Sequence, residues 1–151
     1  MILPTKENYI SVNYFDLYML IVNVDNDKDD RELFNIAVGR VDPNISCKLL
    51  TSCADLFDFL KTTVTLPDLV FMDINMPKIN GYQCVQRIRS QNKFEHLKII
   101  IHSTAFNPDG QKKFEDLRLE FLIKPLRLSD LVQSIKQIVS LTNSGNDSWE
   151  E

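Results

Sequence analysis

The chain has 151 residues, 44% of them hydrophobic, with a formal net charge of −4 and a sequence pI of about 5.2. These values predict one domain with a sizeable core, and an acidic chain without a basic stripe is a poor candidate for direct nucleic-acid binding. No apolar stretch reaches the roughly 18 residues needed to span a membrane. Lys6, Glu7 and Asp16 make the N-terminus atypical of a signal peptide, so we expect a cytoplasmic protein without a membrane anchor.

The sequence contains three cysteines, Cys47, Cys53 and Cys84, and none of them forms a C-x-x-C pair. An odd number without that spacing favours buried thiols in a reducing compartment over disulfides or a zinc site. We therefore expect free thiols.

Short apolar runs alternate five times with segments of helical periodicity. The predicted strands cover residues 17–22, 45–50, 67–73, 97–101 and 119–123. The predicted helices follow them at residues 29–40, 52–60, 81–90, 108–117 and 129–138. Ser52 and Ser129 are the expected N-caps of the second and fifth helices. The fourth helix has the fewest apolar anchors and contains Gly110.

Five strands, each followed by a helix, indicate an α/β fold with a parallel sheet covered on both faces. With right-handed crossovers, the doubly wound, flavodoxin-like order 2-1-3-4-5 places the first and third strands side by side. The domain is expected to cover residues 17–141, after an N-terminal extension at 1–16 and before a flexible tail at 142–151.

Acidic residues follow the two strands that this order makes neighbours. Asp25, Asn26 and Asp27 follow the first strand, and Asp73 follows the apolar run 69–72. Open α/β sheets bind ligands at the carboxyl ends of their strands, so the two groups are expected to share a cation-binding pocket. Taken singly, Asp25 and Asp27 could equally be helix caps and Asp73 could start a turn.

Four short motifs lie in order at the ends of predicted strands. They are Val24-Asp25-Asn26-Asp27, Met72-Asp73-Ile74-Asn75-Met76-Pro77 with Gly81, Ser103-Thr104-Ala105, and Lys124-Pro125. Together they resemble the receiver domain of two-component response regulators over residues 17–141. Any one of these motifs alone would be weak, whereas four in register are specific to this family.

The resemblance implies a stand-alone receiver for phosphorelay signal transduction. Asp73 would be the phosphoacceptor, taking a phosphoryl group from a phosphohistidine of a sensor histidine kinase or histidine phosphotransfer protein. A Mg²⁺ ion would neutralise the phosphoryl oxygens. The implied ligands of this ion are Asp25, Asn26, Asp73 and the backbone carbonyl of Asn75.

Three further residues receive roles from the same resemblance. Lys124 would pair first with the Asp73 carboxylate and then with a phosphoryl oxygen, aimed by a cis peptide before Pro125. Thr104 would donate its hydroxyl to the phosphoryl group, and Phe121 would repack as Thr104 moves. Such a protein catalyses only its own phosphorylation and dephosphorylation. It would pass the phosphoryl group on or bind an unidentified protein target.

The chain departs from the family at Asn26, where a second acidic residue is usual. One carboxylate fewer means less mutual repulsion to recruit a cation, so we expect weak Mg²⁺ binding. Asp27 could compensate, although its register points toward the helix start. Phe106, beside the expected route of an attacking water, could shield the acyl phosphate.

Three other classes of protein share part of this pattern. The run that starts at Asp25 resembles an EF-hand loop, but Asp30 and Ile36 stand where Gly and Glu are required. Haloacid-dehalogenase phosphatases share the Asp-x-Asp spacing of residues 25 and 27, yet Asp29 stands where they have Thr or Val. A pseudo-receiver, which binds a partner without phosphorylation, is the closer alternative because of Asn26. His96 and His102 have no second ligand pattern near them.

Overall fold

Five parallel strands form the centre of the computed structural model, which describes residues 19–104 and 110–146. The strands are β1 (Leu20–Val24), β2 (Ser46–Leu50), β3 (Leu69–Met72), β4 (Ile99–Ser103) and β5 (Glu120–Ile123). Their order is β2-β1-β3-β4-β5, and every neighbouring pair is parallel. The predicted doubly wound α/β fold is confirmed.

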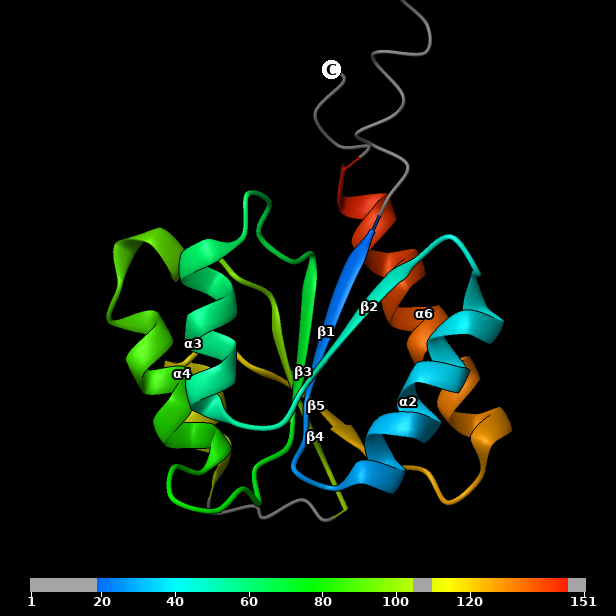
Figure 1. The fold of residues 1–151 in the computed structure, drawn as a ribbon, viewed down its shortest axis with the longest axis horizontal. Coiled ribbons are helices and arrows are strands. Elements are labelled where there is room, and N and C mark those ends of the chain that lie inside the picture. Colours follow the sequence, from blue (N-terminus) through cyan, green and yellow to red (C-terminus); the bar gives the residue numbers. More distant parts are fainter. Residues whose placement is uncertain (1–18, 105–109, 147–151) are drawn as a thin grey trace, which may run out of the picture.

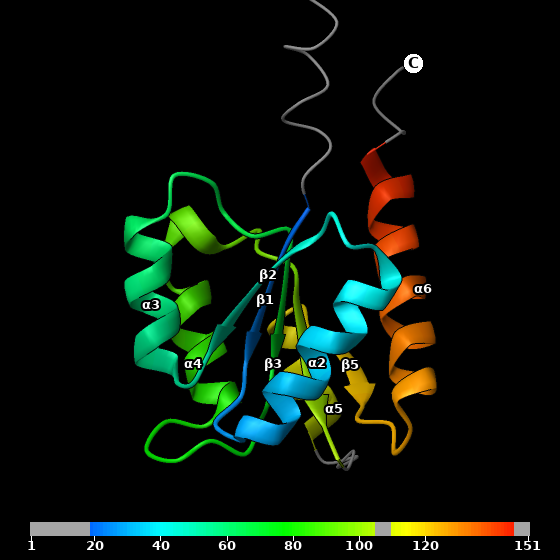
Figure 2. The same cartoon turned by 45° about the vertical axis from the view of Figure 1, so that its right-hand side comes forward.

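Helices cover both faces of the sheet (Figure 1). They are α2 (Lys28–Val41), α3 (Cys53–Thr62), α4 (Gly81–Arg89), α5 (Gln111–Asp116) and α6 (Leu128–Asn146), with a 3-10 turn at Asn92–Phe94. In Figures 1 and 2, α3 and α4 lie on one side of the sheet and α2 and α6 on the other. None of the described helices is long and apolar enough to cross a membrane.

The alternation of side chains along β3 explains why this strand is apolar throughout. Val70 and Met72 face the core beneath α3 and α4, whereas Leu69 and Phe71 face the core beneath α2 and α6. All four are fully buried. A central strand covered on both faces needs apolar side chains on both, and it ends where the first polar residue, Asp73, reaches the sheet edge.

Of the two predicted N-caps, Ser52 is confirmed and Ser129 is not. Ser52 is the N-cap of α3, and its hydroxyl accepts a hydrogen bond from the N–H of Asp55. The expectation for Ser129 is wrong, because α6 already begins at Leu128 and Ser129 lies in its first turn. The N–H of Leu131 donates to the carbonyl of Arg127, so the first helical turn closes on Arg127. Helix α6 also continues through Asn146, into the segment expected to be a tail.

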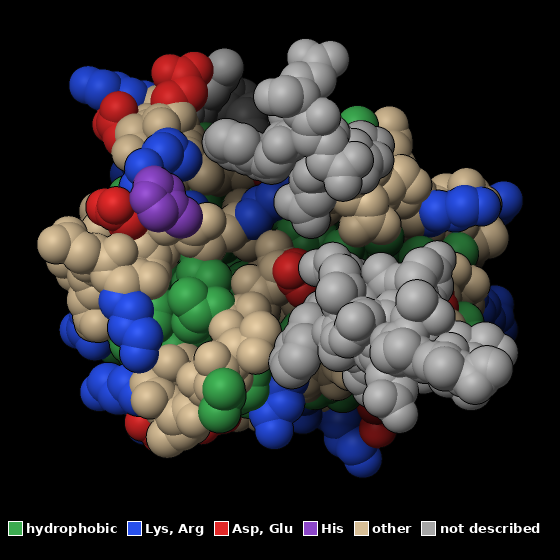
Figure 3. Space-filling model, turned by 90° about the horizontal axis from the view of Figure 1, so that it is seen from above, with side chains coloured by type: hydrophobic (Ala, Val, Ile, Leu, Met, Phe, Trp, Pro, Cys, Tyr) green, Lys and Arg blue, Asp and Glu red, His purple; other side chains and the backbone are tan. Residues whose placement is uncertain are grey.

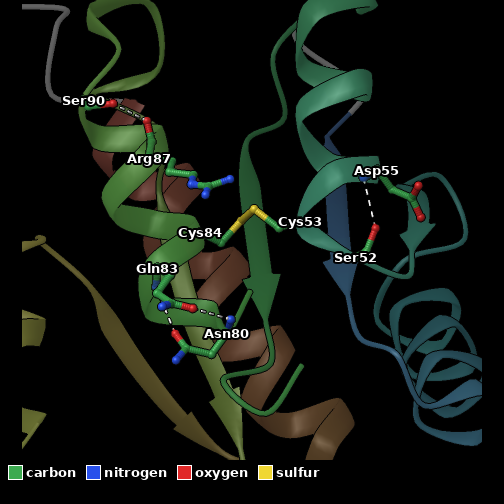
Figure 4. Close-up of a disulfide and its surroundings, with 8 residues drawn as sticks. All are labelled: Ser52, Cys53, Asp55, Asn80, Gln83, Cys84, Arg87 and Ser90. Carbon is green, nitrogen blue, oxygen red and sulfur yellow. Dashed lines mark hydrogen bonds between the residues drawn. A yellow bond between two sulfur atoms is a disulfide. The ribbon is translucent and has the colours of Figure 1, made fainter. Parts of the chain in front are cut away.

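A disulfide joins Cys53, the first residue of α3, to Cys84 in α4 (Figure 4). The expectation of free thiols is therefore wrong for these two residues. Their separation of 31 residues gave no sign of a pair, but the fold brings the two Cα atoms to 5.7 Å, a distance that a disulfide spans. Cys47 is free, and burial raises the pKa of its thiol to about 11.

The two ends of the sheet differ in chemistry. Figure 3 looks onto the end at which the strands begin, where basic and acidic side chains are interspersed on the described surface. The carboxyl ends of the strands lie at the opposite end of the molecule, at the bottom of Figure 1. The acidic residues singled out in the sequence lie there.

Candidate functional site

The pairing of β1 with β3 brings the two acidic groups together. Val24 and Met72 are partners in register, so Asp25 and Asp73 leave the sheet side by side. The N–H of Asp73 donates to the carbonyl of Val24 at 3.0 Å, which extends the ladder to the first polar residue. The two carboxylate residues are only 2% and 8% exposed, respectively. Two buried carboxylates at one sheet edge require a counter-charge.

Lys124 supplies that charge from the end of β5. Its ammonium nitrogen Nζ lies 2.7 Å from Oδ2 of Asp25, 2.9 Å from Oδ2 of Asp30 and 3.5 Å from Oδ2 of Asp73. The side chain of Lys124 is 11% exposed, and those of Asp25 and Asp73 are 2% and 10% exposed, so water screens these two pairs little. The ammonium therefore connects three carboxylates that come from β1, α2 and β3.

The backbone at Lys124 differs from the family expectation, because the peptide before Pro125 is trans. The N–H of Lys124 donates to the carbonyl of Ser103 at 2.7 Å, so Lys124 continues the ladder between β4 and β5. Its four-carbon side chain then reaches Asp25 without a cis bond.

The electrostatic environment shifts both main groups of the site. Burial raises the pKa of the Asp73 carboxyl above its usual value, although the nearby charge of Lys124 acts in the opposite direction. Burial by itself would lower the pKa of Lys124. Its hydrogen bonds to Asp25 and Asp30, together with the charges of Asp25 and Asp73, outweigh that effect and raise it. Lys124 is therefore firmly protonated at neutral pH.

The loop after β3 is held close to Asp73. The N–H of Asn75 donates to Oδ1 of Asp73 at 3.2 Å. Gly81, at the start of α4, packs so tightly against the loop that a Cβ atom there would lie 2.6 Å from the carbonyl oxygen of Asp73. The glycine of the sequence motif therefore lets α4 begin directly against the backbone of Asp73.

The remaining predicted residues lie around this centre. Asn26 and Asn75 are exposed in the loops after β1 and β3, and Thr104 is exposed just after β4. Phe121 is half-buried on β5, and its ring packs edge-on against Phe114, with centroids 5.4 Å apart. Phe106 lies outside the described residues. The structure thus gathers Asp25, Asp73 and Lys124 and leaves the roles of Thr104 and Phe121 as predictions.

Two acidic residues differ from the sequence analysis. Asp27 does not reach the site, because its carboxylate is the N-cap of α2 and accepts a hydrogen bond from the N–H of Asp30. Asp30 does reach it, and sequence reasoning missed this. Acidic residues in the first turn of a helix are ordinarily explained by the helix dipole, so nothing distinguished Asp30 from Asp29.

The oxygen atoms present suit a hard cation such as Mg²⁺. Asp25 and Asp73 offer carboxylates, Asn26 an amide oxygen and Asn75 a backbone carbonyl, and Mg²⁺ prefers such oxygen donors and keeps several waters. Within the described residues, however, no three acidic, His or Cys side chains are grouped as a metal site. Lys124 instead neutralises the two carboxylates.

Fold and site together define a doubly wound α/β domain with a carboxylate pocket at its switch point. The family model of the response regulator receiver domain matches residues 21–136. The chain belongs to the response regulator receiver family.

Relatives and solved structures agree with this assignment. The sensor histidine kinase CheAY of Helicobacter pylori is 26% identical over 137 residues, which cover 90% of this chain and 17% of that protein. The sensory transduction protein LytT of Oceanobacillus iheyensis is 42% identical over 60 residues, covering 39% of this chain and 24% of that protein. The chain thus spans a small part of these curated relatives.

Among solved structures, the phosphorylated cyanobacterial phytochrome response regulator RcpA has a TM-score of 0.75 at 23% identity, covering 85% of this chain and 96% of that chain. The Mn²⁺-bound form of response regulator Rcp1 has a TM-score of 0.69 at 21% identity, covering 81% of this chain and 92% of that chain. At these identities the likeness shows the fold alone.

Proposed function

We propose that this protein accepts a phosphoryl group on Asp73 from a phosphohistidine of a sensor histidine kinase or a histidine phosphotransfer protein. The observation that carries the proposal is the buried carboxylate of Asp73 at the end of β3, 3.5 Å from the ammonium of Lys124. Membership of the receiver family supports a phosphohistidine donor, and so does the similarity of the chain to part of a sensor histidine kinase.

The residues at this site suit the transfer. A carboxylate oxygen of Asp73 forms a bond to phosphorus while the phosphorus–nitrogen bond of the phosphohistidine breaks, and the imidazole nitrogen leaves with the bonding electrons. Lys124 neutralises charge on the phosphoryl oxygens, and Thr104 donates its hydroxyl to one of them. Phe121 repacks with Thr104 and carries the change to a surface that binds an unidentified protein partner.

We assign Asp25, Asn26, Asp73 and the Asn75 carbonyl as the ligands of Mg²⁺. When bound, the ion supplies positive charge to the transferring phosphoryl group. Response regulator Rcp1, which has a similar fold, has been solved in a Mn²⁺-bound form, and this supports divalent-cation binding by this fold. We also propose a cytoplasmic location, which is the one expected for a receiver domain.

The test is phosphorylation of the purified chain with acetyl phosphate and Mg²⁺, read as intact mass. We expect a gain of one phosphate that Asp73→Asn abolishes and that Asp58→Asn, a matched change on the exposed side of α3, leaves unchanged. No gain with acetyl phosphate or a phosphodonor protein would instead favour the pseudo-receiver, which Asn26 and the pairing of both carboxylates with Lys124 make the second candidate.

A further inference from the structure

Asp30 is a carboxylate at this site that belongs to none of the four sequence motifs. It lies in the first turn of α2, and its backbone is fixed because its N–H donates to Oδ1 of the N-cap Asp27 at 2.9 Å. Its own carboxylate is 2.9 Å from Nζ of Lys124, whereas the carboxylate of Asp73 is 3.5 Å from the same atom. The proposed phosphoacceptor is therefore the most distant of the three partners.

The hydrogen-bonding capacity of Lys124 makes this ordering important. An ammonium has three donors in a compact head. Two of them are directed to Asp25 and Asp30, at 2.7 and 2.9 Å, so Asp30 holds the ammonium toward α2 and away from Asp73. The side chain of Asp30 is 44% exposed, whereas that of Asp25 is 2% exposed, so Asp30 is the partner that Lys124 can release more readily.

The packing around Lys124 and Asp30 is incomplete on one side. A small cavity of about 30 Å³ lies beside the pair and is lined by Asp30, Leu33, His102, Lys124, Pro125 and Leu131. Lys124 and Asp30 are therefore not closely packed on this side, in contrast to the core side chains around them.

We propose that Asp30 is a positioning residue that competes with the phosphorylated Asp73 for Lys124. Before transfer, Asp30 keeps the ammonium from closing on Asp73 and so leaves a carboxylate oxygen of Asp73 available as the nucleophile. After transfer, the phosphoryl group offers three strong acceptor oxygens and more negative charge than a carboxylate, and Lys124 leaves Asp30 for it. This inference rests on the proposed function of Asp73.

The first arm of the test needs no phosphorylation. In a crystal structure of Asp30→Asn, we expect Nζ of Lys124 to move from 3.5 Å to about 2.8 Å from Oδ2 of Asp73, the usual distance for a charge-assisted hydrogen bond. In Asp29→Asn, which changes the exposed neighbouring residue on α2, the wild-type arrangement should persist. A Lys124 that stays in its wild-type position in Asp30→Asn would overturn the inference, whatever the fate of the proposed function.

The second arm follows the half-life of the acyl phosphate after removal of acetyl phosphate. Without its competitor, Lys124 should pair with the phosphoryl group more fully, and Asp30→Asn should lengthen the half-life by about threefold or more. The single variant Asp30→Glu, which keeps a carboxylate at this position, should have the wild-type half-life. Asp29→Asn should have the wild-type half-life as well. An unchanged half-life in Asp30→Asn would refute the competition. Complete lack of phosphorylation in the wild type would refute the proposed function and leave the first arm decisive.

Discussion

Asn26 sets the charge of the proposed metal site. The residue is exposed at the end of β1, next to the buried Asp25, and its amide contributes an oxygen but no charge. Asp30 does not replace the missing charge on the metal side, because its carboxylate is bonded to Lys124. We therefore expect the affinity for Mg²⁺ to be limited, because the proposed site has two carboxylates and these already share one ammonium.

We predict that Asn26→Asp tightens Mg²⁺ binding on the order of tenfold, which corresponds to about 1.4 kcal/mol. The added carboxylate brings charge to the cation and raises the mutual repulsion that the cation relieves. Calorimetric titration with Mg²⁺ measures the dissociation constant. Asn44→Asp, at an exposed position before β2 and at the other end of the sheet, is the control and should not change it. An unchanged constant in Asn26→Asp would show that residue 26 is not a ligand.

At the scale of single elements, the disulfide between α3 and α4 is the feature with the clearest consequence. It closes a loop with a sequence separation of 31, and this loop contains β3 and Asp73. It also ties down α4, whose first residue packs against the backbone of Asp73. The bond therefore restrains the framework of the site as well as the unfolded chain.

We predict that removing this bond lowers the free energy of unfolding by about 3–4 kcal/mol, the loop-closure value for a loop of this length. Urea unfolding of the oxidised protein and of the protein in excess reductant measures the difference. The double variant Cys53→Ala with Cys84→Ala should be insensitive to reductant, whereas Cys47→Ser should respond as the wild type does. If the urea unfolding curves of the wild type with and without reductant superimpose, the prediction is wrong. Cys53 and Cys84 would then be free thiols, as expected in a reducing compartment.

The elements were predictable to the extent that local pattern determines them. The apolar run of β3 and the hydroxyl of Ser52 each specify their structure within a few residues. The start of α6 was missed because the chain closes its first turn on Arg127, for which no capping side chain gives a signal. Contacts between segments far apart in the chain could not be predicted from local sequence patterns. The Cys53–Cys84 pair and the reach of Asp30 to Lys124, 94 residues away, appear only once the chain is folded.

At the scale of the whole molecule, the number of strands and the right-handedness of the crossovers predicted the strand order of the sheet. That order in turn determines where the acidic site lies. Right-handed crossovers leave few topologies for five alternating strands and helices. The chosen one makes β1 and β3 neighbours, so Asp25 and Asp73 meet although 48 residues separate them. The strand order therefore predicts that Asp25 and Asp73 share a pocket. It does not predict the hydrogen bond between Asp30 and Lys124, which depends on how individual side chains pack.

The pH dependence of stability is a property of the whole fold, and one buried side chain, His102, makes a separable contribution to it. His102 on β4 is 5% exposed and packs against Phe34 and Phe71, and neither of its ring nitrogens has a hydrogen-bond partner among the residues that the structure describes. Burial, aided by the charge of Lys124, lowers the pKa of His102 from 6.5 to about 4. In the folded protein the imidazole is therefore neutral at pH 6, where the unfolded chain already binds a proton.

Because the unfolded state binds more protons between pH 6.5 and about 4, stability falls as the pH is lowered through this window. We predict that His102 accounts for a loss of roughly 3 kcal/mol across it, given about 1.4 kcal/mol for each pH unit. Urea unfolding at a series of pH values should show a smaller decline in His102→Leu than in the wild type. The exposed His96 provides the matched control, and His96→Gln should retain the wild-type decline. The carboxyl groups titrate in all three proteins, so the difference between the curves isolates the imidazole. If the free energy of unfolding declines equally with pH in His102→Leu and in the wild type, folding does not lower the pKa of His102 and the prediction is wrong.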